Sequence, residues 1–266
     1  MSAKTVKKKE TQKEPEISSV SDASRARFID ARNRVVLGDF KLEGIGCLAE
    51  KTTHAVIKLY LEPDTSYHER VVCGRMVADV QNEVGIFEIQ TASFKYLNKK
   101  LEKFFEYDDV TVVYPCVSTK WVIWVDKNGT VSKRNRCPKK GSPANVFWEL
   151  YQIKKHLKNP KFRLLVLMID VDEYKLLSEK GNGKKGAKRF DRVPVGLVGE
   201  YIIREAKDYL TLLPPLPDKF TATDMARLTH LTAQRGWGIV SVLLELDLVE
   251  VAEKKGRSTY YRLKSE

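Results

Sequence analysis

Apolar residues between positions 46 and 91 recur first at helical spacing and then at strand spacing. The segment GCLAEKTTHAVIKLYLEP (46–63) predicts a helix that ends at Pro63, with an apolar stripe formed by Leu48, Val56, Leu59 and Tyr60. The segments HERVVCGRMVADVQ (68–81) and NEVGIFEIQT (82–91) alternate or run apolar and are interrupted by glycine and asparagine. This pattern predicts about three strands.

The following residues repeat the change of period. The segment SFKYLNKKLEKFFEY (93–107) predicts an amphipathic helix with Ser93 as its N-cap and one apolar face, formed by Phe94, Leu97, Leu101, Phe104 and Phe105. VTVVYP (110–115) predicts a buried strand bounded by Pro115, and WVIWVDKNGTV (121–131) a strand with a tight turn. SPANVFWELYQIKKHL (142–157) and FRLLVLMID (162–170) predict a helix and a further buried strand. We therefore expect an α/β fold in which helices flank a mixed sheet.

Composition changes mark three regions along the chain. Residues 1–38 combine lysines, acids and serines with little periodicity and predict a disordered basic tail. Whether the segment SRARFIDARNRV in this tail forms a short helix is left open. Residues 39–213 form the predicted α/β domain. Residues 214–266 follow the proline-rich segment LLPPLPDK (212–219) and predict helix, turn, helix and β-hairpin. That order resembles a winged helix-turn-helix, a fold that serves both DNA binding and protein interaction.

The charge is strongly basic and unevenly distributed. The formal net charge is +12, and the stretch from Lys120 to Arg163 holds twelve Lys or Arg against only Asp126 and Glu149. A second basic cluster, KGNGKKGAKRFDR (180–192), is interpreted as a flexible linker. Such an excess favours a polyanionic partner, although a surface tuned for solubility has the same composition. The candidate nucleic-acid contacts are Lys133, Arg134, Arg136, Lys139, Lys140, Arg235, Lys255 and Arg257.

Other classes of site and location are disfavoured. The four cysteines and four histidines are scattered without metal-ligand spacing, which argues against a zinc site and favours reduced thiols. No apolar run approaches the roughly 20 residues that span a bilayer. The charged N-terminus has no apolar segment after it, unlike a secretory signal. We expect a cytoplasmic protein without a membrane partner.

Two carboxylates stand out in the stretch VADVQNEVGIFEIQT (77–91). Asp79 and Glu88 fall in adjacent predicted strands that otherwise look buried, and a buried carboxylate is costly unless it is paired or binds a metal. A hairpin brings both to one end of the sheet, and strand alternation puts Gln90 on the same face as Glu88. Glu50 lies early on the preceding helix, and Lys100 lies on the helix that follows.

This order of elements and acids resembles the PD-(D/E)xK nuclease superfamily, which includes restriction endonucleases and Holliday-junction resolvases. The resemblance covers about residues 44–116, and the chain also resembles uncharacterised bacterial proteins of this superfamily. Two positions depart from the motif, because Ala78 replaces its proline and Gln90 stands at the lysine position. The resemblance implies a restriction-endonuclease-like core and Mg²⁺- or Mn²⁺-dependent hydrolysis of DNA. In that scheme Asp79 and Glu88 hold the metal, Gln90 positions the water, Glu50 assists as outer ligand or base, and Lys100 compensates for the missing lysine.

Two alternatives stay open at this point. The chain could retain the nuclease fold as an inactive DNA-binding regulator, or it could be an adaptor whose C-terminal unit binds a protein. The target sequence, the strand preference and a homodimeric state are also left open.

Overall fold

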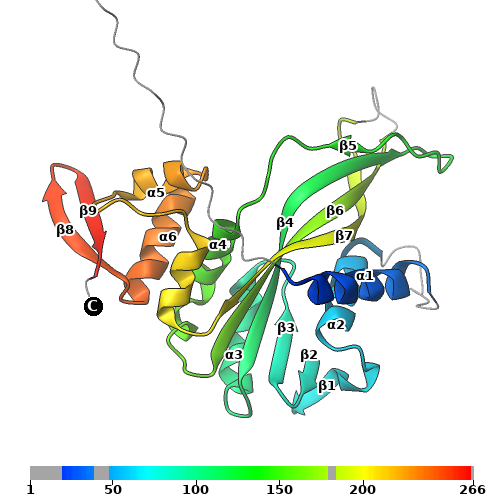
Figure 1. The fold of residues 1–266 in the computed structure, drawn as a ribbon, viewed down its shortest axis with the longest axis horizontal. Helices are drawn as coiled ribbons and strands as arrows, with labels where there is room; N and C mark the ends of the chain where they lie inside the picture. Colours follow the sequence, from blue (N-terminus) through cyan, green and yellow to red (C-terminus); the bar gives the residue numbers. More distant parts are fainter. Residues whose placement is uncertain (1–19, 39–47, 179–183, 265–266) are drawn as a thin grey trace, which may run out of the picture.

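The computed structural model describes residues 20–38, 48–178 and 184–264, with the backbone alone for residues 48–51. The protein has an α/β fold built on one mixed sheet with the strand order β1-β2-β3-β4-β6-β7, as Figure 1 shows. The strands are β1 (His68–Cys73), β2 (Met76–Asn82), β3 (Gly85–Ile89), β4 (Val110–Val125), β6 (Phe162–Leu176) and β7 (Lys188–Ile203), and the short β5 (Asn135–Arg136) pairs with β4.

The sheet combines antiparallel and parallel pairs. Strands β1, β2 and β3 form an antiparallel meander, and β3 pairs with β4 in parallel. Strand β6 is parallel to β4 and antiparallel to β7. The parallel β3–β4 pair requires a crossover, which the chain makes through the 3₁₀ turn η2 (Phe94–Leu97) and helix α3 (Asn98–Phe104). As predicted, the Ser93 side chain caps the start of this crossover by accepting from the Lys95 N–H.

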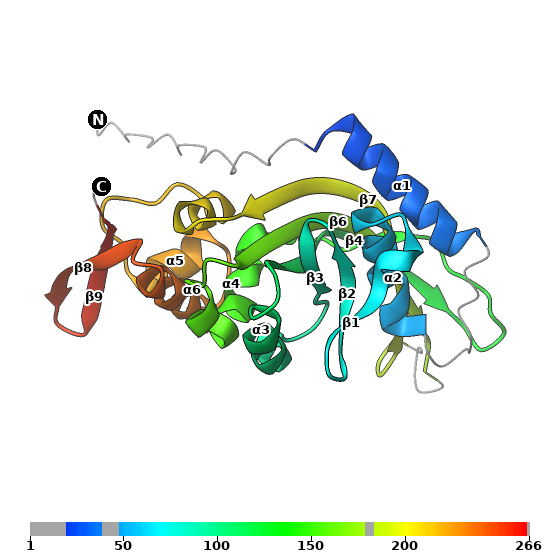
Figure 2. The same ribbon diagram turned by 90° about the horizontal axis from the view of Figure 1, so that it is seen from below.

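Helices cover both faces of the sheet (Figure 2). Helices α1 (Asp22–Val36) and α2 (Leu48–Leu61) pack on one face, where Ile57 of α2 joins Val113 and Ile169 of the sheet in one core. The other face packs against α3 and α4 (Val146–Leu150). Further 3₁₀ segments are η1 (Thr65–Tyr67), η3 (Pro143–Asn145), η4 (Tyr151–His156) and η5 (Ala206–Leu212).

The strand that was predicted to end at Pro115 does not end there. Strand β4 runs through this proline for 16 residues and stays paired with β6 there. Proline is tolerated because the last β3 partner of β4 is Val113. Beyond this residue β3 no longer flanks β4, so the missing N–H removes no bond from the β3–β4 ladder.

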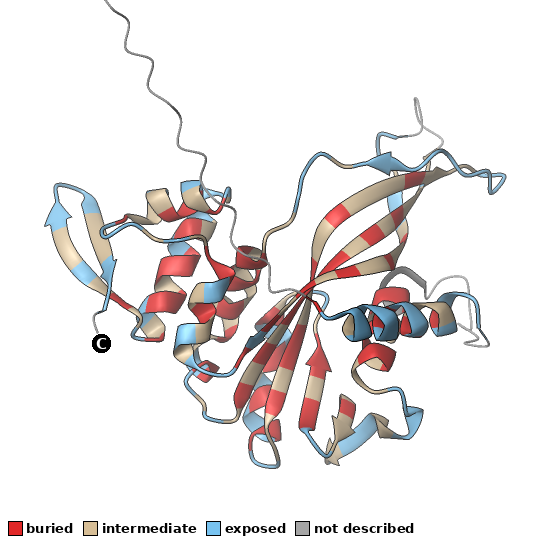
Figure 3. Cartoon of the chain, viewed as in Figure 1, coloured by how far each residue is buried: buried red, intermediate tan, exposed pale blue. Residues whose placement is uncertain are grey.

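Two segments predicted to be irregular are regular structure. Residues 22–36 form α1 rather than part of a disordered tail, because Phe28, Ala31 and Val35 bury one face of this helix. Residues 1–19 lie outside the described part of the chain. The basic cluster 180–192 is not simply a linker, since β7 begins at Lys188 and pairs with β6 along its length. Figure 3 shows buried and intermediate positions interspersed along these long strands.

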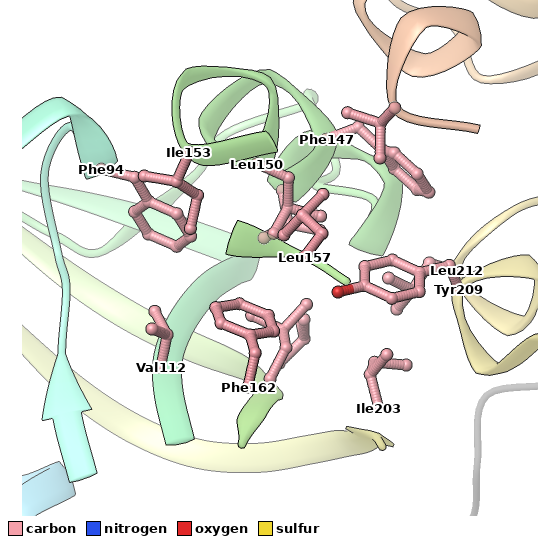
Figure 4. Close-up of a cluster of buried hydrophobic side chains, with 14 of the residues drawn as sticks. Phe94, Val112, Phe147, Leu150, Ile153, Leu157, Phe162, Ile203, Tyr209 and Leu212 are labelled. Atoms are coloured by element: carbon pink, nitrogen blue, oxygen red, sulfur yellow. The ribbon is translucent and has the colours of Figure 1, made fainter. Parts of the chain in front are cut away.

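The C-terminal segment forms helices α5 (Ala222–Leu228) and α6 (Ala233–Glu245), followed by the hairpin β8 (Val249–Lys255) and β9 (Ser258–Leu263). The predicted order of helix, helix and hairpin is therefore present. Its apolar residues join the core of the α/β part, as shown by Phe220 and Ile239, which belong to the same buried cluster as Phe147 and Leu150. Figure 4 shows this cluster around Phe147, Phe162 and Tyr209. Among the described residues, no helix is both long and apolar enough to cross a membrane.

Candidate active site

The β2–β3 hairpin places Asp79 and Glu88 across from one another. The antiparallel register pairs Val80 with Phe87, and Asp79 and Glu88 are the next residues outward on the two strands. The Ile89 N–H donates a 2.7 Å hydrogen bond to Asp79 Oδ2 and so holds the Asp79 side chain against β3. The two carboxylates that the sequence analysis singled out are therefore neighbours.

Glu88 is the more deeply buried of the two. The residue is 4% exposed, and its Oε2 accepts a 2.7 Å hydrogen bond from Lys100 Nζ on α3. Its Oε1 is also buried, with no hydrogen-bond partner among the described residues. Burial, with a smaller contribution from the Asp79 charge, raises the pKa of Glu88 to about 7, although Lys100 acts in the opposite direction. An unsatisfied buried carboxylate oxygen is uncommon and indicates a position that a ligand can fill.

The pKa of Asp79 is shifted in the opposite direction from that of Glu88. His54 Nε2 on α2 lies 3.2 Å from Asp79 Oδ2. Burial acts to raise the pKa of Asp79, but His54 and the Ile89 N–H outweigh it and hold this pKa below its usual range. Asp79 is therefore ionised at neutral pH, while Glu88 is divided between its two protonation states.

The position of His54 depends on how α2 is attached to the sheet. The Thr52 hydroxyl donates a 2.8 Å hydrogen bond to Asp191 Oδ2, and the Thr53 hydroxyl donates a 2.6 Å bond to the Arg192 carbonyl oxygen. These bonds attach the helix to β7 directly beside His54. Glu50 lies on the same helix, but its side chain is outside the described part of the structure, so its predicted role stays a prediction.

A hydrogen-bond network fixes Gln90. Its amide nitrogen donates to the Ser93 carbonyl oxygen at 2.8 Å, and the Ser93 hydroxyl donates to Gln152 Oε1 at 2.7 Å. Gln152 in turn donates to Glu149, which also accepts from the Phe94 N–H. With its nitrogen engaged, the Gln90 side chain keeps its amide oxygen as an acceptor for a further group.

A small pocket of about 30 Å³ lies beside this site, next to the attachment of α2. Its lining includes Thr53, Thr91, Pro115, Val117, Arg189 and Arg192. The Arg192 guanidinium donates to Glu173 at 2.7 Å, whereas its buried Nε has no hydrogen-bond partner among the described residues. The pocket thus presents cationic donors where Thr53, the neighbour of His54 in the chain, attaches α2 to β7.

The donor set fits a hard divalent cation only in part. The described residues contain no group of three or more His, Cys, Asp or Glu side chains that could hold a metal ion. Mg²⁺, however, is commonly bound through one or two carboxylates, with water and substrate phosphates completing its shell. Asp79, Glu88 and the unpartnered Glu88 oxygen suit that arrangement and do not suit a structural zinc site.

Of the predicted catalytic residues, Asp79, Glu88 and Lys100 lie close together. Gln90 directly follows the end of β3, the strand that carries Glu88. Sequence reasoning missed His54. Its only signal was its place on the helix that precedes these strands and carries Glu50, because its partner Asp79 is distant in the chain.

The predicted nucleic-acid contacts fall into two groups. Lys133, Arg134, Arg136, Lys139 and Lys140 are exposed along β5 and its flanking loop. In the C-terminal unit, Lys255 pairs with Glu253 and Arg257 is exposed in the β8–β9 turn. Arg235 differs, because it is half-buried and donates a 3.1 Å hydrogen bond to Asn145.

The chain belongs to the family described as a domain of unknown function (DUF8091), which it matches over residues 51–204. This range contains the whole sheet and the side chains of Asp79, Glu88, Lys100 and His54. The chain is also similar to a protein of Treponema pallidum (strain Nichols) titled "Uncharacterized protein", with 25% identity over 225 residues that cover 82% of this chain and 87% of the relative. No solved structure matches the chain.

Proposed function

We propose that the protein is a metal-dependent DNA nuclease with a restriction-endonuclease-like core. The observation that carries this proposal is the Asp79–Glu88 pair, in which one carboxylate is ionised and the other has a buried, unpartnered oxygen. The order of α2, the β1–β3 meander, α3 and the parallel strand β4 supports the resemblance to the PD-(D/E)xK superfamily.

Asp79 and Glu88 would hold Mg²⁺ or Mn²⁺ in this function. When bound, the ion would supply positive charge at the scissile phosphate and lower the pKa of the attacking water. His54 and the Ile89 N–H orient Asp79, and Glu88 would hold the ion in its ionised form. The Gln90 amide oxygen positions the water. Lys100, now paired with Glu88, supplies the positive charge that glutamine lacks at the motif lysine position.

The C-terminal unit supports a contact with DNA, which we assign to its hairpin. Helices α5 and α6 followed by β8 and β9 have the order of a winged helix-turn-helix. The first half of α6 packs against α4, since Arg235 bonds to Asn145 and Gly238 lies next to Trp148. The β8–β9 turn, with Lys255 and Arg257, is exposed and is the element that reaches DNA.

One observation favours the alternative of an inactive DNA-binding regulator. The Lys100 ammonium already neutralises Glu88 at 2.7 Å, which is also how a purely structural carboxylate is satisfied. A structural pair would leave no reason for the second Glu88 oxygen to be buried without a partner. We therefore place the nuclease first.

A cleavage assay tests the proposal. Supercoiled plasmid, single-stranded DNA and branched DNA are incubated with the protein in Mg²⁺, Mn²⁺ or EDTA. We expect metal-dependent cleavage by the wild type and a loss of about 100-fold or more in Asp79→Ala and Glu88→Ala, since each removes a metal ligand. Glu83→Ala, in the exposed β2–β3 turn, is the matched control and keeps wild-type activity.

DNA binding without cleavage of any substrate in either metal would favour the inactive regulator. Equal cleavage by Asp79→Ala and the wild type would place the active site elsewhere.

A further inference from the structure

The far ends of β4, β6 and β7 extend beyond the helices that cover the sheet (Figure 1). We call this region, residues 118–140, 170–176 and 184–194, the basic arm. It contains 13 Lys or Arg and 5 Asp or Glu, and so carries two-thirds of the formal net charge of +12. The arm also holds two of the four tryptophans, Trp121 and Trp124, which are three residues apart on β4 and therefore lie on opposite faces of the sheet.

Arg134 is fixed on Trp121 in a layered arrangement. Its guanidinium carbon lies 3.8 Å from the centroid of the indole ring, and its Nε donates a 2.7 Å hydrogen bond to Asp172 Oδ1. The tryptophan occupies one face of the guanidinium and the aspartate one edge. The Arg134 side chain is still 44% exposed, which leaves its other face and its outer N–H groups toward solvent. A guanidinium held this way offers both a stacking plane and phosphate donors.

Trp124 has a similar cationic setting on the opposite face of β4. Lys175 Nζ and Lys184 Nζ each lie 5.6 Å from the centroid of its ring. Each face of the arm therefore carries one tryptophan with cations over its ring. An aromatic stacking surface among cations is the combination that binds single-stranded nucleic acids without strong sequence preference.

We propose that the basic arm binds single-stranded DNA, with unpaired bases stacked on the Trp121–Arg134 layer and with the backbone phosphates on the surrounding cations. Duplex DNA fits less well, because its bases are already stacked on both faces and cannot lie against this layer. Exposed lysines alone would attract both forms through charge.

The arm also reaches the pocket at the attachment of α2, since Arg189 and Arg192 belong to its lining. The buried Arg192 Nε, with no hydrogen-bond partner among the described residues, is a donor suited to a phosphate oxygen. A single strand bound on the arm is also a candidate substrate for the carboxylate site. That this strand is the substrate rests on the proposed nuclease function, whereas binding by the arm does not.

Intrinsic tryptophan fluorescence tests the stacking directly. An oligothymidylate of about 16 nucleotides is titrated into the full chain in EDTA, so that no cleavage is required. We expect quenching in the wild type and in the Trp148→Phe/Trp237→Phe double variant, which keeps both tryptophans of the arm. The Trp121→Phe/Trp124→Phe double variant should lose the quenching.

Conservative variants separate stacking from charge. Arg134→Lys keeps the charge but removes the planar group, so we expect affinity for the oligothymidylate to fall about tenfold. Arg75→Ala, in the exposed β1–β2 turn, removes a charge away from the arm and should leave affinity within about twofold. A duplex of equal length should bind more weakly than the single strand and should be less affected by Arg134→Lys.

The proposal is overturned by any of three results, namely quenching that survives in Trp121→Phe/Trp124→Phe, an unchanged affinity of Arg134→Lys, or tighter binding of duplex than of single strand. Loss of arm binding with cleavage intact would reject the arm alone. Arm binding without cleavage in Mg²⁺ would reject the nuclease and leave the arm.

Discussion

Replacing Glu88 with glutamine should remove a pH dependence of stability that the structure builds into this residue. Burial, with the neighbouring Asp79 charge, raises the pKa of Glu88 from 4.5 to about 7. Glutamine keeps the shape of the side chain and imitates its protonated form. The variant therefore isolates the free-energy change caused by ionising this one carboxyl.

The direction follows from proton binding. Between pH 4.5 and about pH 7 the folded protein binds more protons at Glu88 than the unfolded chain does. The free energy of unfolding therefore falls as the pH rises through this range and is constant above it. A pKa raised from 4.5 to about 7 corresponds to about 3 kcal/mol in total. Wild type should lose that amount between about pH 4 and about pH 8 relative to Glu88→Gln.

Urea unfolding in EDTA across this pH range measures the difference. Glu83→Gln serves as the control, because Glu83 is an exposed glutamate in the turn of the same hairpin. The difference between wild type and Glu83→Gln should not change with pH. If Glu88→Gln and the wild type keep the same difference at all pH values, Glu88 titrates at its ordinary value and the account of its burial is wrong.

Two further stability predictions concern other parts of the fold. Glu173 accepts hydrogen bonds from Arg192 at 2.7 Å and from Lys120 at 3.0 Å. Burial acts to raise the pKa of Glu173, but the two cations outweigh burial and lower this pKa to about 2. Glu173→Gln should lower the free energy of unfolding at neutral pH by about 2 kcal/mol, and urea titrations should show this deficit shrinking below about pH 4, where the wild-type carboxylate loses its advantage. In α6, a Cβ on Gly236 would lie 2.4 Å from the Ala222 carbonyl oxygen, whereas one on Gly238 would meet nothing closer than 3.5 Å. Thermal unfolding should therefore show a lower Tm for Gly236→Ala and an unchanged or higher Tm for Gly238→Ala, which gains up to about 1 kcal/mol of helix propensity; a shift of the same sign in both variants would contradict this packing.

The parts of the site that could be predicted from sequence are close together along the chain. A hairpin with a short turn constrains its two strands, so Asp79 and Glu88 could be placed side by side from their spacing alone. Lys100 could be nominated because its helix directly follows β3. In each case the connecting chain is too short to allow many other arrangements.

The parts that could not be predicted depend on packing between distant segments. His54 reaches Asp79 only because Thr52 and Thr53 attach α2 to β7, and no local pattern encodes that contact. Strand β7 was missed because its first residues are the charged end of a basic cluster and carry no clear alternation. Helix α1 was only an open possibility within a predicted disordered tail, because a small set of apolar residues forms its buried face.

Titration of Mn²⁺ into the metal-free protein, with the free ion followed by EPR at about pH 8, tests the central claim most directly. At that pH Glu88 is mostly ionised, since its pKa is about 7. We predict one site in the wild type and in Glu83→Ala, and its loss in both Asp79→Ala and Glu88→Ala. Binding that is unchanged in the two variants, or absent from the wild type, would contradict the assignment of this carboxylate pair as a metal centre.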